Sequence, residues 1–115
     1  MSLHRVCKLS DVGDSPVAFR VPPLEDDIVV FWSGGEVHAL EGHCPHQFYP
    51  FELGADVQPE FRDGSGAQVL VCPLHGWRFD LKTGKNPDSP MLCLAVYPVT
   101  IQNGEVWIEI AAEAQ

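Results

Sequence analysis

The sequence predicts an all-β domain, built as an antiparallel sandwich or small barrel. Ten glycines and ten prolines among 115 residues divide the chain into short segments, which argues against a helical bundle. Between them lie runs rich in β-branched and aromatic residues, the composition typical of strands. Apolar residues do not repeat at the helical period over ten residues in any part of the chain. We expect one domain over residues 1–115.

The first half of the chain contains three predicted strands. Residues 17–21 form a short run that ends at a pair of prolines. Residues 28–32 are an unbroken apolar run, as expected for a strand that is buried on both faces. The sequence Ser-Gly-Gly-Glu at 33–36 predicts a hairpin turn into the third strand, over 37–40.

The second half continues this pattern. Residues 68–71 and 77–81 predict two strands, and the second of them leads into the Lys-Thr-Gly turn of 82–84. A further strand is expected over 94–101. Pro98 lies inside it and lacks an N–H group, so we expect an edge position or a bulge there.

The C-terminal strand, over 105–110, has the clearest alternation. Its even-numbered positions are Val106, Ile108 and Ile110, and the odd-numbered ones are more polar, which predicts one buried face and one half-exposed face. The dipeptide Asn103-Gly104 stands before it and is a strong signal for a type I′ hairpin turn.

Two segments do not fit the strand pattern. One runs from 42 to about 67 and the other from 73 to about 76. A loop of the first length is rare in a compact domain unless it has a function. Both segments begin beside a cysteine that is followed closely by a histidine.

Composition and charge exclude several functions. Seven basic and sixteen acidic residues give a net charge of −9, which argues against nucleic-acid binding and favours basic partner surfaces. The longest apolar run is 28–32, far shorter than a membrane span of about 20 residues. The N-terminus shows no export signal, so we expect a cytoplasmic protein without a membrane segment.

The cysteines point to a metal site. There are four, Cys7, Cys44, Cys72 and Cys93. A reducing cytoplasm disfavours disulfides. Two of the four belong to the sequences Cys44-Pro45-His46 and Cys72-Pro73-Leu74-His75, and each of these offers a thiolate and an imidazole from one tight turn. The proline after each cysteine stiffens that turn.

The spacing of these pairs is uncommon for zinc, because zinc fingers usually group Cys with Cys and His with His. It matches the Rieske arrangement, in which two Cys hold one iron of a [2Fe–2S] cluster and two His hold the other. The chain resembles the Rieske-type ferredoxins over about residues 36–110, in particular those that serve aromatic-ring-hydroxylating oxygenases. The matching segments are Val71-Cys72-Pro73-Leu74-His75-Gly76-Trp77-Arg78-Phe79-Asp80-Leu81-Lys82-Thr83-Gly84, Tyr97-Pro98-Val99, the Asn103-Gly104 hairpin, and Pro50 with Gly54.

The resemblance implies a ligand set and a role. Cys44 and Cys72 would bind the inner iron, and His46 and His75 the outer, more exposed iron. The cluster-binding loops would span about 42–54 and 72–90. The protein would have no catalytic residues. It would be a soluble, monomeric one-electron carrier that passes electrons from an NAD(P)H-dependent flavin reductase to a terminal oxygenase.

The chain departs from the family pattern at two places. Phe48 replaces a loop glycine. The gap between His46 and Cys72 holds 25 residues, more than is common in the family. We interpret the extra residues, about 55–67, as an exposed loop excursion that supplies no ligand but affects partner recognition.

The residues around the predicted ligands indicate the reduction potential. High-potential Rieske proteins carry a cysteine pair between the loops, and Ser and Tyr hydroxyls aimed at the sulfurs. This chain has Tyr49 and Leu74 at the cysteine positions, Trp77 for the serine and Phe79 for the tyrosine. We therefore expect a potential toward the low end of the range of about −150 to +300 mV.

Alternatives remain open at this point. The small subunit of an assimilatory nitrite reductase shares the fold, and a zinc-stabilised binding module would use the same four ligands.

Cys7 and Cys93 are expected to pack as small hydrophobes, and His4 and His38 to be ordinary surface or sheet residues. His43 is too close to Cys44 for easy chelation. Trp77 is expected to fill the core and shield the cluster. The aromatic residues Phe48, Tyr49 and Phe51 are either buried under the excursion or form an exposed rim for a partner.

Overall fold

The computed structural model describes residues 2–22, 24, 26–45, 49–59, 68–74, 76–87 and 89–110, and these contain twelve β-strands and two 3-10 helices. The strands are β1 (Ser2–Lys8), β2 (Val17–Phe19), β3 (Ile28–Ser33), β4 (Glu36–Glu41), β5 (Asp56–Pro59), β6 (Gln68–Val71), β7 (Arg78–Asp80), β8 (Lys85–Asn86), β9 (Ser89–Cys93), β10 (Val96–Tyr97), β11 (Val99–Gln102) and β12 (Glu105–Ile110). The 3-10 helices are η1 (Leu9–Asp11) and η2 (Phe51–Leu53). The all-β class predicted from the sequence is confirmed. Within the described ranges no helix is long and apolar enough to cross a membrane.

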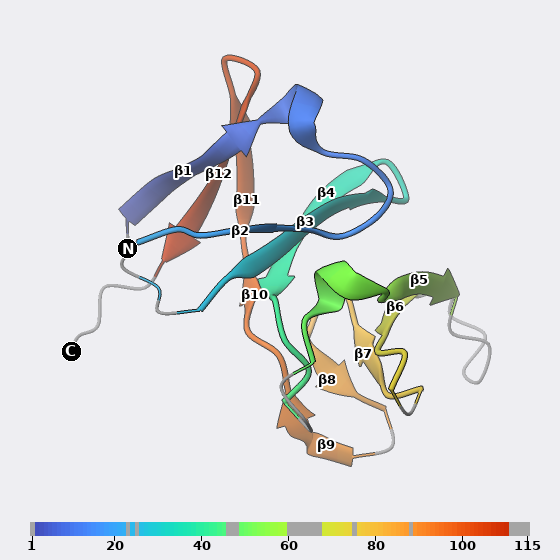
Figure 1. Ribbon diagram of the computed structural model, residues 1–115. Coiled ribbons are helices and arrows are strands. Elements are labelled where there is room, and N and C mark those ends of the chain that lie inside the picture. Colours follow the sequence, from blue (N-terminus) through green and yellow to red (C-terminus); the bar gives the residue numbers. More distant parts are fainter. Residues whose placement is uncertain are drawn as a thin grey trace.

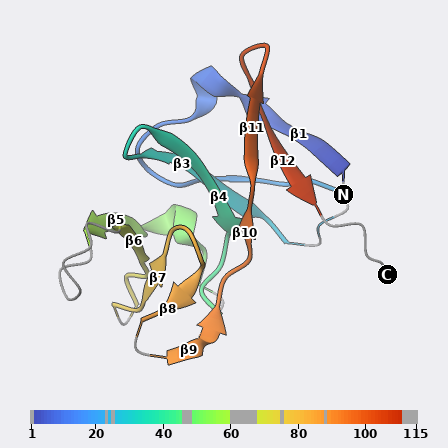
Figure 2. The ribbon, with the colours of Figure 1, turned by 180° about the vertical axis from the view of Figure 1, so that it is seen from behind.

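The strands divide into two regions (Figure 1). The base region consists of two antiparallel sheets, with strand orders β1-β12-β11 and β10-β4-β3-β2. The loop region consists of the sheet β5-β6-β7, the pair β8-β9 and the turns between them. The view from behind shows the same separation, with β10 leading up from the loop region into the base (Figure 2).

Each region has its own buried core. In the base, Val106 and Ile108 of β12 pack with Val30 and Ala39 of the other sheet. The alternating burial of β12 confirms the predicted buried face. Ile28 to Phe31 of β3 are at most 1% exposed, as predicted for a strand buried on both faces. Because successive side chains of β3 point to opposite faces, Val29 and Phe31 reach the core that includes the loop region.

Two hairpin turns match their sequence signals. Gly34 and Gly35 have φ of 62° and 79°, and Asn103 and Gly104 have φ of 53° and 75°. A type I′ turn requires positive φ at both central residues, so the predicted turn at Asn103-Gly104 is confirmed. The Cα pairs Ser33↔Glu36 and Gln102↔Glu105 close the two hairpins.

The strand expected over 94–101 is divided in two. β10 pairs with β4, whereas β11 pairs with β12 in the other sheet. Pro98 stands between them. Proline has no backbone N–H and donates no hydrogen bond to a neighbouring strand. The chain therefore passes from one sheet to the other at a residue whose nitrogen needs no acceptor.

The segment expected as a loop from 42 to 67 is partly ordered into regular structure. It contains η2 and the strand β5, which pairs antiparallel with β6 from Asp56↔Val71 to Pro59↔Gln68. The expectation of an exposed loop excursion over 55–67 is therefore wrong for 56–59, and residues 60–67 lie outside the described part of the chain. β5 contains one strongly apolar residue, Val57, and its strand structure depends on pairing with β6 rather than on local pattern.

Candidate metal centre

The first cysteine lies in a turn that directly follows β4. Cys44 is 1% exposed, and its N–H donates to the carbonyl oxygen of Tyr49 at 2.9 Å. His43 and Pro50 form a bridge across the base of this turn. Gly42 enters it with its N–H bonded to the carbonyl of Asp27, and a Cβ at Gly42 would lie 2.6 Å from that oxygen. The entry to the turn is thus packed too closely against the base region for any side chain.

The second cysteine lies at the start of the turn between β6 and β7. Cys72 is also 1% exposed. Its N–H donates to the carbonyl of Trp77 at 2.8 Å, and its own carbonyl accepts the N–H of Gly76 at 3.0 Å. Gly76 has φ of 70°, a conformation that favours glycine. The two turns therefore have the same arrangement, in which a buried cysteine begins the turn and backbone hydrogen bonds close it.

Packing brings the two turns together. Cys44 and Cys72 belong to one buried cluster, which also contains Phe51 and Phe79. A Cβ placed on Gly54 would be in ordinary contact, 3.5 Å, with Cγ of Pro73. Segments that are distant in the sequence thus converge at one end of the molecule (Figure 1).

The two thiols suit a metal. Neither takes part in a disulfide. A thiolate buried among apolar side chains is costly without a cation, and a bound metal ion offsets that cost. His46 and His75, the other two predicted ligands, lie outside the described residues. The complete set of four ligands therefore stays a prediction.

The remaining cysteines differ from each other. Cys7 is buried in the base core, as expected, and burial raises the pKa of its thiol, with a smaller contribution from the negative charge of Asp11. Cys93 is exposed in β9, so the expectation that it packs as a small hydrophobe is wrong. The alternation of β9 explains this, because Leu92 points to the core and its neighbour points away.

The aromatic residues after the first cysteine pack inward where they are described. Phe51 is fully buried and Tyr49 packs against the same core. An exposed rim that includes Phe51 is therefore excluded, and Phe48 lies outside the described residues. Trp77 packs partly buried against this core, as expected for a core filler. The exposed large apolar residues of the loop region are instead Leu53, Leu74 and Met91, and Met91 is 95% exposed.

Charge is distributed unevenly between the regions. The described loop region has three acidic residues (Glu52, Asp56, Asp80) and three basic ones (Arg78, Lys82, Lys85). The described base region has eight acidic residues (Asp11, Asp14, Asp26, Asp27, Glu36, Glu41, Glu105, Glu109) and three basic ones (Arg5, Lys8, Arg20). Among the described residues the negative charge therefore belongs mainly to the base, a property that the total charge of the chain does not reveal.

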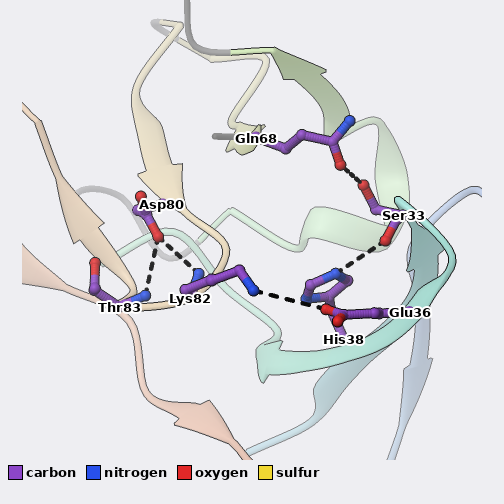
Figure 3. Close-up of polar contacts among 7 residues, drawn as sticks. All are labelled: Ser33, Glu36, His38, Gln68, Asp80, Lys82 and Thr83. Atoms are coloured by element: carbon purple, nitrogen blue, oxygen red, sulfur yellow. Dashed lines mark hydrogen bonds and ion pairs between the residues drawn. The ribbon is translucent and has the colours of Figure 1, made fainter. Parts of the chain in front are cut away.

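A cleft of about 550 Å³, lined mainly by residues of polar and charged types, lies where the β3–β4 hairpin meets the loop region. Figure 3 shows the contacts that cross it, a hydrogen bond between the side chains of Ser33 and Gln68 and an ion pair between Lys82 and Glu36 at 3.8 Å. His38 bonds to the Ser33 carbonyl at 3.2 Å and stacks on Phe31. His38 is therefore a sheet residue, as expected, and the sequence contains no signal for the contacts across the cleft.

Comparison with known proteins identifies the family. A family model described as Rieske [2Fe-2S] domain matches residues 2–98. The ferredoxin component of an alkene monooxygenase system from Xanthobacter autotrophicus is 30% identical, over 90% of this chain and 77% of that protein. The ferredoxin subunit of 3-phenylpropionate/cinnamic acid dioxygenase from Shigella flexneri is 31% identical, over 95% and 93%. Some relatives are longer than this chain. The match spans 62% of the length of a Rieske domain-containing protein from Homo sapiens and 27% of the length of a 4beta-methylsterol monooxygenase from Methylococcus capsulatus.

Solved structures share the fold. A ferredoxin from Sphingomonas yanoikuyae superposes with a TM-score of 0.71 at 30% identity, over 93% of this chain and 97% of that one. A candidate small subunit of an NADH-dependent nitrite reductase from Mycobacterium tuberculosis superposes with a TM-score of 0.77, over 96% and 97%. The second likeness, at 19% identity, shows the fold alone.

Proposed function

Since the chain belongs to the Rieske [2Fe–2S] domain family, we propose that it carries single electrons from an NAD(P)H-dependent flavin reductase to a terminal oxygenase. The cofactor of this family is a [2Fe–2S] cluster of the Rieske type, and the related ferredoxin components belong to oxygenase systems. The direction of transfer and the two partners are our proposal. So are a monomeric state and a cytoplasmic location.

We assign the cluster to four residues. Cys44 and Cys72 hold the inner iron, and His46 and His75 hold the outer iron. The cluster supplies one reversible electron. Because two imidazoles replace two thiolates, the oxidised site has two fewer negative charges than a four-thiolate site, and it accepts an electron more easily. The chain's own residues bury the two thiols and keep water from them.

One observation carries this proposal. Two thiols that form no disulfide, each 1% exposed, begin two turns that pack against each other. A structural core has no need for this repeated arrangement, whereas a cluster bound between two loops requires it. In both turns a histidine follows the cysteine within two or three positions of the sequence, and this spacing is the reason why we assign the imidazoles to the same cluster.

The described loop region also suits partner contact. Leu74 lies next to His75 in sequence and is 41% exposed, and Met91 is almost fully exposed. The described residues of the two turns contain no Asp, Glu, Lys or Arg. Exposed apolar side chains without charge favour brief contact with an apolar patch on a partner. We propose electron transfer here and no catalysis.

The first experiment is spectroscopic. The purified chain should be red-brown, contain two irons and two sulfides, and give after dithionite reduction the anisotropic EPR signal of a mixed His/Cys cluster. Cys44→Ser, Cys72→Ser, His46→Ala and His75→Ala should each abolish that signal. Cys93→Ser and Cys7→Ser are matched controls that should keep it. A colourless protein with stoichiometric zinc, or a Cys44→Ser variant with the unchanged signal, would refute the assignment.

The partner is tested separately. Reduced protein should pass its electron to a ring-hydroxylating oxygenase, and a flavin reductase with NADH should reduce the oxidised form. A chain that is stable only in complex with a large nitrite reductase subunit would support the alternative function. This alternative shares the fold, and a chain with all four predicted ligands would carry the same cluster in either role, so the spectrum does not separate it from the ferredoxin.

A further inference from the structure

Two carboxylates flank the first cysteine turn, and both bond to backbone N–H groups at the boundary with the base region. Glu41 is the last residue of β4 and precedes Cys44 by three positions. Its Oε1 accepts the N–H of Ala95 at 2.7 Å. Glu52 lies in η2, beyond the turn, and its Oε2 accepts the N–H of Ala18 at 3.1 Å.

The contacts of Glu41 join the two segments of chain that connect the base region with the loop region. Its backbone N–H donates to the carbonyl of Ala95 at 2.9 Å, so Glu41 holds Ala95 by both backbone and side chain. Ala95 lies between β9 of the loop region and β10 of the base. The point at which the chain enters the first turn is therefore fastened to the point at which it leaves the loop region.

The contact of Glu52 holds the other end of the turn. β2 is the outer strand of the sheet β10-β4-β3-β2, so one of its edges has no neighbouring strand in that sheet. The N–H of Ala18, on β2, bonds to Glu52, and η2 lies against β2 (Figure 1). Phe51, next to Glu52, is fully buried in the core that contains Cys44.

We propose that Glu41 and Glu52 are positioning residues that hold the first cluster-binding turn, and with it Cys44, in place against the base region. The proposal rests on the assignment of Cys44 to the cluster. A hydrogen bond to an ionised acceptor is stronger than one between neutral groups, so each carboxylate restricts its end of the turn. Neither residue touches the metal in this proposal.

The test uses the full chain with its cluster. Glu41→Ala and Glu52→Ala should lose the visible absorption band on the order of tenfold faster in the presence of an iron chelator. Their EPR lines should broaden, because Cys44 then samples several positions. Glu41→Gln keeps an oxygen acceptor and should restore most of the stability of the cluster. Glu109→Ala removes a carboxylate from β12 of the base and is the matched control, with unchanged cluster loss.

A second readout does not depend on the cluster. Hydrogen exchange of the peptide covering 42–54 should be faster in Glu41→Ala and Glu52→Ala, and exchange of the peptide covering 105–110 should stay unchanged. Unchanged exchange and unchanged cluster loss in both variants would overturn the proposal, as would a Glu41→Gln variant that behaves like Glu41→Ala. If the parent protein contains no iron but the two alanine variants still exchange faster over 42–54, the proposed function is refuted. The positioning role is then supported.

Discussion

The rings of Phe51 and Phe79 lie with their centroids 6.2 Å apart and their planes at 57°. Both side chains are fully buried. Phe51 follows the first cysteine turn and Phe79 follows the second, so this contact joins the two halves of the candidate metal centre. Tilted aromatic pairs at this distance are favourable beyond the area that they bury, by about 0.5–1.5 kcal/mol.

Removing one ring should therefore destabilise the protein and loosen the site together. Phe51→Ala should lower the free energy of unfolding by about 3–5 kcal/mol, the usual cost of a large cavity in a core, and should speed the loss of the cluster. Urea unfolding and the decay of the visible band measure the two effects. Ile108→Ala, in β12 of the base, is the control, since Ile108 is fully buried in the base core and should affect stability more than cluster lifetime.

Gly84 should tolerate no side chain. It has φ of 78°, and a Cβ there would lie 2.1 Å from the carbonyl oxygen of Leu94. Gly84→Ala should cost about 2–5 kcal/mol, because the strain of positive φ adds to overpacking. Gly104 has a similar φ but open space around its Cβ position. Gly104→Ala should therefore cost only about 1–2 kcal/mol. Equal losses in thermal unfolding would contradict this explanation.

Tyr97 should titrate at high pH. Burial raises the pKa of its phenol above the usual 10, and the negative charges of Glu41 and Asp26 raise it further. The folded state then holds the proton more tightly than the unfolded state. This contribution to stability is complete below about pH 10 and is lost as the pH rises through the raised pKa.

Absorbance at 295 nm in a Tyr49→Phe background follows Tyr97 alone, because the chain has two tyrosines. Asp26→Asn removes one of the two charges and should lower the pKa without changing the burial of the ring. A titration at the ordinary value in the parent protein would show that the ring is accessible to water.

The reduction potential should lie toward the low end of the range of about −150 to +300 mV for Rieske centres. Phe79 is fully buried and has no hydroxyl, at the position where high-potential relatives of the fold carry a tyrosine. Phe79→Tyr should raise the potential, since a hydroxyl bonded to sulfur stabilises the reduced cluster. A spectroelectrochemical titration measures both proteins. A parent potential well above zero would exclude this interpretation.

Local patterns were sufficient for much of the fold. The unbroken apolar run of β3, the alternation of β12 and the turn at Asn103-Gly104 depend on neighbours in sequence, and all were predicted. The two cysteine turns were also visible, because each pairs its residues within three or four positions. The single domain over 1–115 and the histidine ligands stay predictions.

Other features depend on residues that are distant in the sequence. β5 forms because β6 lies beside it. The strand expected over 94–101 is divided at Pro98 because its first part pairs with one sheet and its second part with the other. Glu41 and Glu52 were part of no sequence motif, and their bonds to Ala95 and Ala18 exist only once the regions have packed. The sequence alone was enough to propose which side chains carry the chemistry, since spacing within a turn is local. Tertiary structure decided how the first of those turns is fastened to the base region, because backbone N–H groups look alike until folding places a carboxylate beside one of them.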